Sequence, residues 1–205
     1  MSWIKHVFYN ESEGKLRKSY DRIKGKKNYI DNILTVHGLR PHTLEGHMTL
    51  YKSVLHHNGN TLPKWILEAL GTYVSLLNNC EYCFEHHFAG LKTLLQDDLK
   101  AIELREAFIS DKLNNVFSEN ELSLFSYPKA LTRSCSEMPK SSIDRMKRNG
   151  FSDGEILEVN QVVSYFAYAN RTVLGLGVST KGDILGLSPS ASDDPTNWSH
   201  DRAKE

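Results

Sequence analysis

The sequence lacks the features by which membrane, secreted and nucleic-acid-binding proteins are recognised. No apolar run approaches the roughly 18 residues of a membrane-spanning helix, and residues 1–6 lack the apolar segment of a secretory signal. Lysine and arginine together number 25, as do aspartate and glutamate, so there is no basic excess of the kind that nucleic-acid-binding proteins carry. We therefore expect a soluble, cytoplasmic protein with neither a membrane nor a nucleic-acid partner.

Cysteine is scarce, and its odd count of 3 argues against a disulfide framework. Two of the cysteines, Cys80 and Cys83, form a C-x-x-C pair, whereas Cys135 stands alone between two serines. In a reducing compartment such a pair is more often redox-active or metal-binding than a structural disulfide. The sequence gives Cys135 no partner and no expected role.

Alternating strand patterns and internal repeats are also missing, and apolar residues recur instead at helical spacings of three and four. Ser118 precedes Glu121 and Ser152 precedes Glu155, each at the spacing of a helix-starting capping box. The sequence therefore predicts an all-α domain of seven to nine helices.

We expect a single domain over residues 1–178, with its core motif in 62–95, followed by a loose polar extension over 179–205 that is rich in Gly, Pro, Ser and Asp. Within the domain, Thr61 is expected to cap a helix that has Pro63 in its first turn. The pair His56-His57 is expected at a helix C-terminus, where positive charge favours the helix dipole.

The C-x-x-C pair has the spacing of a reactive site if a helix starts at Cys80. Cys83 then lies one turn further on and His87 one turn beyond that, so the three side chains share one edge. A helix N-terminus and a neighbouring imidazole both favour the thiolate over the thiol, whose ordinary pKa is near 8.5. A thiolate that attacks a peroxide becomes a sulfenic acid, and a second thiol condenses with it to a disulfide.

Glu68 precedes Cys80 by twelve residues, on the preceding predicted helix. Two antiparallel helices joined by a tight turn at Asn78-Asn79 would bring its carboxylate back toward the edge that carries His87. By spacing alone, Glu68 is equally compatible with a surface acid.

These residues resemble the motif of the alkylhydroperoxidase D-like group in the carboxymuconolactone decarboxylase superfamily, and in particular its peroxidase-related branch. The pattern of that group is Glu, eleven residues, Cys-x-x-Cys, three residues and His, and here it runs from Glu68 to His87 without a gap. The segments 149–156 and 169–178 resemble a helix start and a helix ending of the same group. The resemblance covers roughly residues 25–178.

The resemblance implies an all-α, homo-oligomeric enzyme (a dimer, trimer or hexamer) that reduces alkyl hydroperoxides with peroxiredoxin-type activity. By position, Cys83 would be the attacking thiol and Cys80 the resolving thiol, with His87 and Glu68 as the proton relay. A dithiol, lipoyl-type or thioredoxin-like, would then reopen the disulfide, and neither a metal nor another cofactor is implied.

One position departs from the motif of well-defined peroxidases in this group, which can carry a histidine between the two cysteines. This chain has Tyr82 there. Tyr82 and the neighbouring His86 are therefore secondary site candidates.

Three other functions stay open at this point. A metal site could use Cys80, Cys83 and His87, with Glu68, His56 or His57 as a fourth ligand. A redox-sensing assembly protein could retain the motif without turnover. A decarboxylase-like reaction on a lactone would be the third, although enzymes of that branch generally lack the dithiol.

Overall fold

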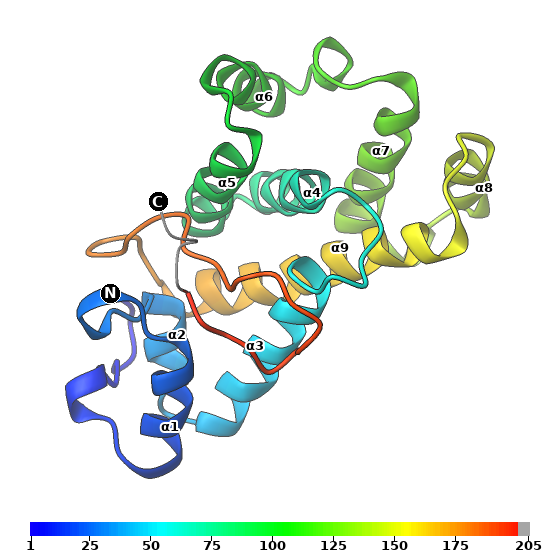
Figure 1. Ribbon diagram of the computed structural model, residues 1–205. Coiled ribbons are helices and arrows are strands. Elements are labelled where there is room, and N and C mark those ends of the chain that lie inside the picture. The colour runs from blue at the N-terminus through cyan, green and yellow to red at the C-terminus, as the bar shows by residue number, and fades with distance from the viewer. Residues whose placement is uncertain (201–205) are drawn as a thin grey trace.

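The structure is a computed structural model that describes residues 1–200. Over that range the chain forms nine α-helices and no strand, which confirms the predicted all-α fold (Figure 1). Among the described helices, none is both long and apolar enough to cross a membrane. The helices are α1 (Gly14–Ile23), α2 (Asn32–His37), α3 (Pro41–Leu55), α4 (Lys64–Leu77), α5 (Glu81–Leu95), α6 (Asp98–Ser110), α7 (Glu119–Arg133), α8 (Lys140–Arg148) and α9 (Asp153–Leu176).

Helix α4 lies at the centre of the molecule, packed between α5, α7 and the long helix α9 (Figure 1). Its apolar residues are buried on every side, and Leu67, Ala69, Leu70 and Val74 have no exposed surface. A helix that is apolar all round belongs in the core. The central position of α4 fixes Glu68, which it carries, deep inside the protein.

The two predicted capping boxes are present. The Ser118 hydroxyl accepts from the backbone N–H of Glu121, whose carboxylate accepts from the backbone N–H of Ser118 at 2.8 Å. Ser152 and Glu155 make the same pair of bonds at the start of α9. Both sequence signatures therefore place the start of their helix correctly.

The start of α4 differs from the prediction, because Pro63 is its N-cap and the helix begins at Lys64. Thr61 does not cap the helix. Its backbone N–H and its hydroxyl instead donate to the Glu158 carboxylate on α9, at 2.8 and 3.0 Å. A charged acceptor from a distant helix makes stronger bonds than a local cap, and it decides where Thr61 points.

The C-terminal segment is not loose over residues 179–200, although it contains no regular helix. Trp198 is 2% exposed, and the guanidinium of Arg22 stacks 3.5 Å from the centre of its ring. Lys52 is fully buried, and its ammonium donates to the backbone carbonyls of His56 and Ser190. The segment is thus fixed along α3 (Figure 1). Residues 201–205 lie outside the described range, and the domain boundary at 178 stays a prediction.

Helices α4 and α9 approach closely where Gly71 faces Phe166. A Cβ atom on Gly71 would lie 2.1 Å from the Phe166 ring, which itself contacts the imidazole of His87 edge-on, with 4.5 Å between ring centres. We expect Gly71→Ala to lower the free energy of unfolding by about 1–3 kcal/mol, because overpacking a core forces side chains to move. Urea denaturation followed by circular dichroism measures the change.

Gly46→Ala on α3 is the matched control, since a Cβ there meets no atom within 4 Å. It should raise stability by about 0.5–1 kcal/mol, the usual gain of alanine over glycine inside a helix. Equal midpoints for the two variants would show that the Gly71–Phe166 contact is not tight.

Candidate functional site

The turn between α4 and α5 places the two cysteines. Asn78 ends α4, Asn79 takes a left-handed backbone with φ of 54°, and Cys80 is the N-cap of α5. Asparagine tolerates the left-handed region better than most residues, which explains Asn79. The fully buried amide of Asn170 on α9 accepts from the Asn78 side chain at 2.9 Å and donates to the Ser75 hydroxyl at 3.1 Å, so α9 holds the turn in place.

The two sulfur atoms lie 3.0 Å apart, within hydrogen-bond distance of each other. Cys80 and Cys83 are 1% and 4% exposed, so neither thiol is free in solvent. Cys83 contributes to the lining of a partly enclosed cavity, whereas Cys80 does not line it. The structure therefore brings the predicted thiol pair together and gives Cys83 the access to the cavity.

The environment separates the acidities of the two thiols. A hydrogen bond from Cys83 lowers the pKa of Cys80, and the backbone N–H of Cys83 adds to this effect, as expected at a helix N-cap. Burial raises the pKa of Cys83, an effect that a hydrogen bond to Asn170 partly opposes. The first proton lost by the pair therefore leaves an anion that both sulfurs share through their hydrogen bond.

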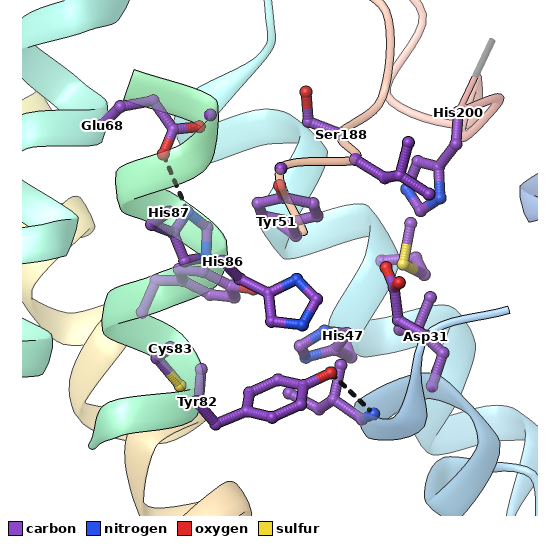
Figure 2. Close-up of a pocket in the computed structure, with 18 residues that line it drawn as sticks. Asp31, His47, Tyr51, Glu68, Tyr82, Cys83, His86, His87, Ser188 and His200 are labelled. Atoms are coloured by element: carbon purple, nitrogen blue, oxygen red, sulfur yellow. Dashed lines mark hydrogen bonds and ion pairs between the residues drawn. The ribbon is translucent and has the colours of Figure 1, made fainter. Parts of the chain in front are cut away.

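His87 and Glu68 form a buried hydrogen-bonded pair across α5 and α4 (Figure 2). Nδ1 of His87 lies 2.8 Å from Oε2 of Glu68, which is 2% exposed. Burial alone would raise the pKa of Glu68, but His87 and His56 outweigh it and hold that pKa below its usual range. Glu68 is thus an anion in the protein interior, paired with His87, and it is not a surface acid.

Tyr82 and His86, the two secondary candidates, both point to the C-terminal segment. The Tyr82 hydroxyl donates to the carboxylate of Asp183 at 2.7 Å, and Nε2 of His86 lies 3.2 Å from the same oxygen. Burial, together with nearby carboxylates, raises the pKa of Tyr82 well above its ordinary value. Tyr82 is therefore a neutral hydrogen-bond donor that ties α5 to the segment.

The cavity that Cys83 faces encloses about 50 Å³, enough for a few water-sized groups. Glu68, Tyr82, Cys83, His86 and His87 lie along one side (Figure 2). The other walls come from distant parts of the chain, and Figure 2 shows Tyr51 and His47 on α3, Asp31 before α2, and Ser188 and His200 on the C-terminal segment.

Solved structures with the same arrangement of helices identify the fold. A peroxidase-related protein from Ralstonia eutropha JMP134, described as an alkylhydroperoxidase AhpD core, superposes with a TM-score of 0.74 over 87% of this chain and 91% of that chain, at 16% sequence identity. The chain has the AhpD-like fold. A second peroxidase-related protein, from Silicibacter sp. TM1040, shares the AhpD-like fold at a TM-score of 0.70 and 19% identity, covering 80% of this chain and 83% of that chain.

The AhpD-like fold also occurs in a protein described as a debrominase. The debrominase Bmp8, as a cysteine-to-alanine variant in complex with 2,3,4-tribromopyrrole, matches with a TM-score of 0.63 and 16% identity over 87% of this chain and 93% of that chain. No protein-family model and no curated protein matches the sequence.

One expectation about histidine is confirmed in position and wrong in charge. His56 is the C-cap of α3, at a helix C-terminus as expected, but it is 6% exposed with Nε2 at 3.6 Å from Oε1 of Glu68. Burial lowers the pKa of His56 to about 4, so the ring is neutral at pH 7. Over residues 1–200, no group of three or more His, Cys, Asp or Glu side chains is arranged to hold a metal ion.

Four site residues had no signal in the sequence: Asp31, His47, Tyr51 and His200. The AhpD-like motif covers only residues 68–87, and these four side chains reach the cavity from before and after it in the chain. His47 and His200 have no catalytic spacing to any other residue. Only tertiary packing brings them to the thiol.

Proposed function

We propose that the chain is a thiol-dependent peroxidase that reduces small hydroperoxides through Cys83 and Cys80. The observation that carries this proposal is the pair of sulfurs 3.0 Å apart, one of which faces a partly enclosed cavity beside the His87–Glu68 pair. The AhpD-like fold of the neighbouring peroxidase-related proteins supports it.

The reaction begins at the shared thiolate. Cys83 attacks because it lines the cavity, and its proton passes either to Cys80 across the sulfur–sulfur hydrogen bond or to His87, one helical turn away in the same cavity. Glu68 stabilises the imidazolium that forms on His87, as a carboxylate does in other proton relays. The attack produces a sulfenic acid on Cys83 and the corresponding alcohol or water.

Cys80 resolves the sulfenic acid. Its sulfur needs to move only about 1 Å from 3.0 Å to reach disulfide bonding distance, and water is released in the step. A dithiol reductant, lipoyl-type or thioredoxin-like, then restores both thiols and completes the cycle. The reaction requires no metal or organic cofactor. By its resemblance to the motif group, we propose a homo-oligomer, and from the composition of the sequence we propose a cytoplasmic location.

Counting free thiols tests the proposal directly. The protein, reduced and freed of reductant, receives one equivalent of ethyl hydroperoxide, and its free thiols are then titrated under denaturing conditions. We expect the loss of two thiols per chain, restored by a dithiol, with Cys135 still free. Retention of all three thiols would contradict the proposal.

Dehalogenation is the second candidate, favoured by the fold shared with a debrominase and by the aromatic walls of the cavity. A dithiol can convert a carbon–bromine bond to carbon–hydrogen, with release of bromide and a proton and oxidation of the thiols to a disulfide. The same thiol titration after addition of 2,3,4-tribromopyrrole distinguishes dehalogenation from hydroperoxide reduction. Thiol loss and bromide release with the bromopyrrole alone would favour dehalogenation.

A further inference from the structure

A second imidazole–carboxylate pair borders the cavity, one residue before the histidine that the proposed function uses. Nε2 of His86 lies 3.2 Å from Oδ2 of Asp183, whose side chain is 2% exposed. His86 lines the cavity together with Cys83 and His87. The proposed function gives His87 and Glu68 a task in thiolate formation, and it gives His86 and Asp183 none.

Asp183 fixes the orientation of the His86 ring. Its carboxylate also accepts the Tyr82 hydroxyl at 2.7 Å and the backbone N–H of Asn32 at 3.2 Å, so it is itself held by both α5 and α2. The rings of Tyr82 and His86 pack together with 4.4 Å between their centres. Because a carboxylate only accepts hydrogen bonds, it places a ring proton on Nε2. Nδ1, the other ring nitrogen, has no hydrogen-bond partner among residues 1–200.

His86 and His87 lie on either side of Cys83, one turn further along α5. At 3.6 residues per turn, His86 is rotated about 60° to one side of Cys83 and His87 about 40° to the other. Cβ atoms at these spacings are about 5–6 Å apart. The two oxygens of a hydroperoxide bridge such a gap, one against the sulfur and the other against the His86 ring, which reaches into the cavity between Cys83 and Asp31 (Figure 2).

Reduction of a hydroperoxide by a thiol needs two proton transfers at different atoms. One proton leaves the sulfur before the attack, and another must reach the oxygen that departs, because an alkoxide is a strong base. The departing oxygen lies at the far end of the O–O bond from the sulfur. A site with two imidazoles, each with its own buried carboxylate, has one group for each transfer.

We propose that His86 is the acid that protonates the leaving oxygen when Cys83 attacks a hydroperoxide, with Asp183 as its positioning residue, a role that rests on the proposed peroxidase function. The Cys83 thiolate bonds to the terminal oxygen of R–O–O–H, the O–O bond breaks, and its electron pair leaves on the R–O oxygen. That oxygen takes the Nδ1 proton of the His86 imidazolium. Sulfur is oxidised to the sulfenic acid and the peroxide is reduced to R–OH. His86 regains a proton from water in place of the one that the thiol gave up.

Two neighbouring groups of the cavity are less suited to this step. Burial lowers the pKa of His47 to about 3, so its ring is neutral at pH 7. The Tyr82 hydroxyl already donates to Asp183, and burial raises the pKa of Tyr82 well above its ordinary value. His86, by contrast, lies one helical turn from the attacking sulfur with a ring nitrogen that has no partner in residues 1–200.

Two substrates that differ in their leaving group test the role of His86. Ethyl hydroperoxide releases ethoxide, which needs a proton, whereas peracetic acid releases acetate, which does not. We expect His86→Gln to lower the rate constant of Cys83 oxidation by ethyl hydroperoxide about 100-fold, within the usual contribution of a general acid. The rate constant with peracetic acid should change little. Single-turnover stopped-flow measurements give both.

Two further variants separate the two imidazole–carboxylate pairs. Asp183→Asn keeps the size of the side chain and an oxygen for the Asn32 N–H, and we expect it to cause the same substrate-selective loss, of about tenfold. Glu68→Gln is the matched variant of the other pair. Since thiolate formation precedes both reactions, it should lower the two rate constants equally and leave their ratio unchanged.

Each other outcome counts against the assignment. An equal loss with both substrates in His86→Gln would overturn the proposal, because His86 would then act before the O–O bond breaks or only through packing. No loss would overturn it as well. If the wild-type protein oxidised Cys83 with neither substrate, the proposed function itself would fail.

The wild-type protein provides a test that does not depend on the folding of a variant. In heavy water, transfer of a deuteron to the departing ethoxide slows the reaction with ethyl hydroperoxide, whereas peracetic acid needs no such transfer. Thiolate formation affects both substrates equally and cancels in the ratio of their rate constants. We expect the ratio of ethyl hydroperoxide to peracetic acid rate constants to fall in heavy water. An unchanged ratio would contradict protonation of the leaving oxygen by a group of the site.

Discussion

Replacing Cys83 with serine is expected to abolish hydroperoxide reduction, lowering turnover at least about 1,000-fold, as losses of an essential nucleophile do. The serine hydroxyl fits the site but is not ionised at neutral pH. The hydrogen bond from the Cys83 thiol is the main cause of the lowered pKa of Cys80, and Cys80 does not line the cavity. It therefore cannot replace the attacking sulfur. Peroxide consumption with dithiothreitol as the dithiol measures the effect.

Two matched variants complete this test. Cys80→Ser should still react once, leaving a sulfenic acid on Cys83 that dimedone traps and mass spectrometry detects. Cys135→Ser should behave as the wild type, because Cys135 is exposed and carries no part of the site. Full activity in Cys83→Ser, or a trapped sulfenic acid on Cys80, would reverse the assignment of the two sulfurs.

Glu68→Gln should lower the rate of Cys83 oxidation about 100-fold, the lower end of what proton transfer by a positioned group contributes. Glutamine has the size of glutamate but no charge, so the His87 imidazolium loses the carboxylate that lies 2.8 Å away. The thiolate then forms less readily, and the rate of alkylation by iodoacetamide should rise only at higher pH than in the wild type.

Glu85→Gln is the control for the loss of a carboxylate near α5. Glu85 lies on the same helix as His87 but pairs with Arg105 near the surface, outside the cavity. Its replacement should leave the alkylation profile unchanged. An unchanged profile in Glu68→Gln as well would remove the His87–Glu68 pair from thiolate formation.

The sequence predicted the parts of this molecule that local chemistry decides. The capping boxes at Ser118 and Ser152 start their helices because the bonds they make lie within four residues. The AhpD-like fold was expected from a motif within twenty residues of chain, and the contact between Glu68 and His87 follows from the antiparallel helices on either side of one turn.

The sequence could not predict the parts that depend on distant packing. His56 lies at a helix C-terminus, as a local cation would, but burial in the fold lowers its pKa to about 4 and makes it neutral, an effect that the nearby Glu68 opposes. Asp31 precedes α2 as its N-cap, yet the backbone N–H of Asn32 donates to the carboxylate of Asp183, which no local pattern could indicate. Asn32 and Asp183 are 151 positions apart, so no local pattern records their contact.

The covering of the cavity by residues 183–200 has a consequence for biosynthesis. Helices α4 and α5, which carry the thiols and the His87–Glu68 pair, are synthesised long before His200 is added, and domains begin to fold during synthesis. For that interval a nascent chain presents its two sulfurs without their cover. We expect oxidants and other thiols to reach the two sulfurs more readily in that interval than after residues 183–200 have packed over the cavity.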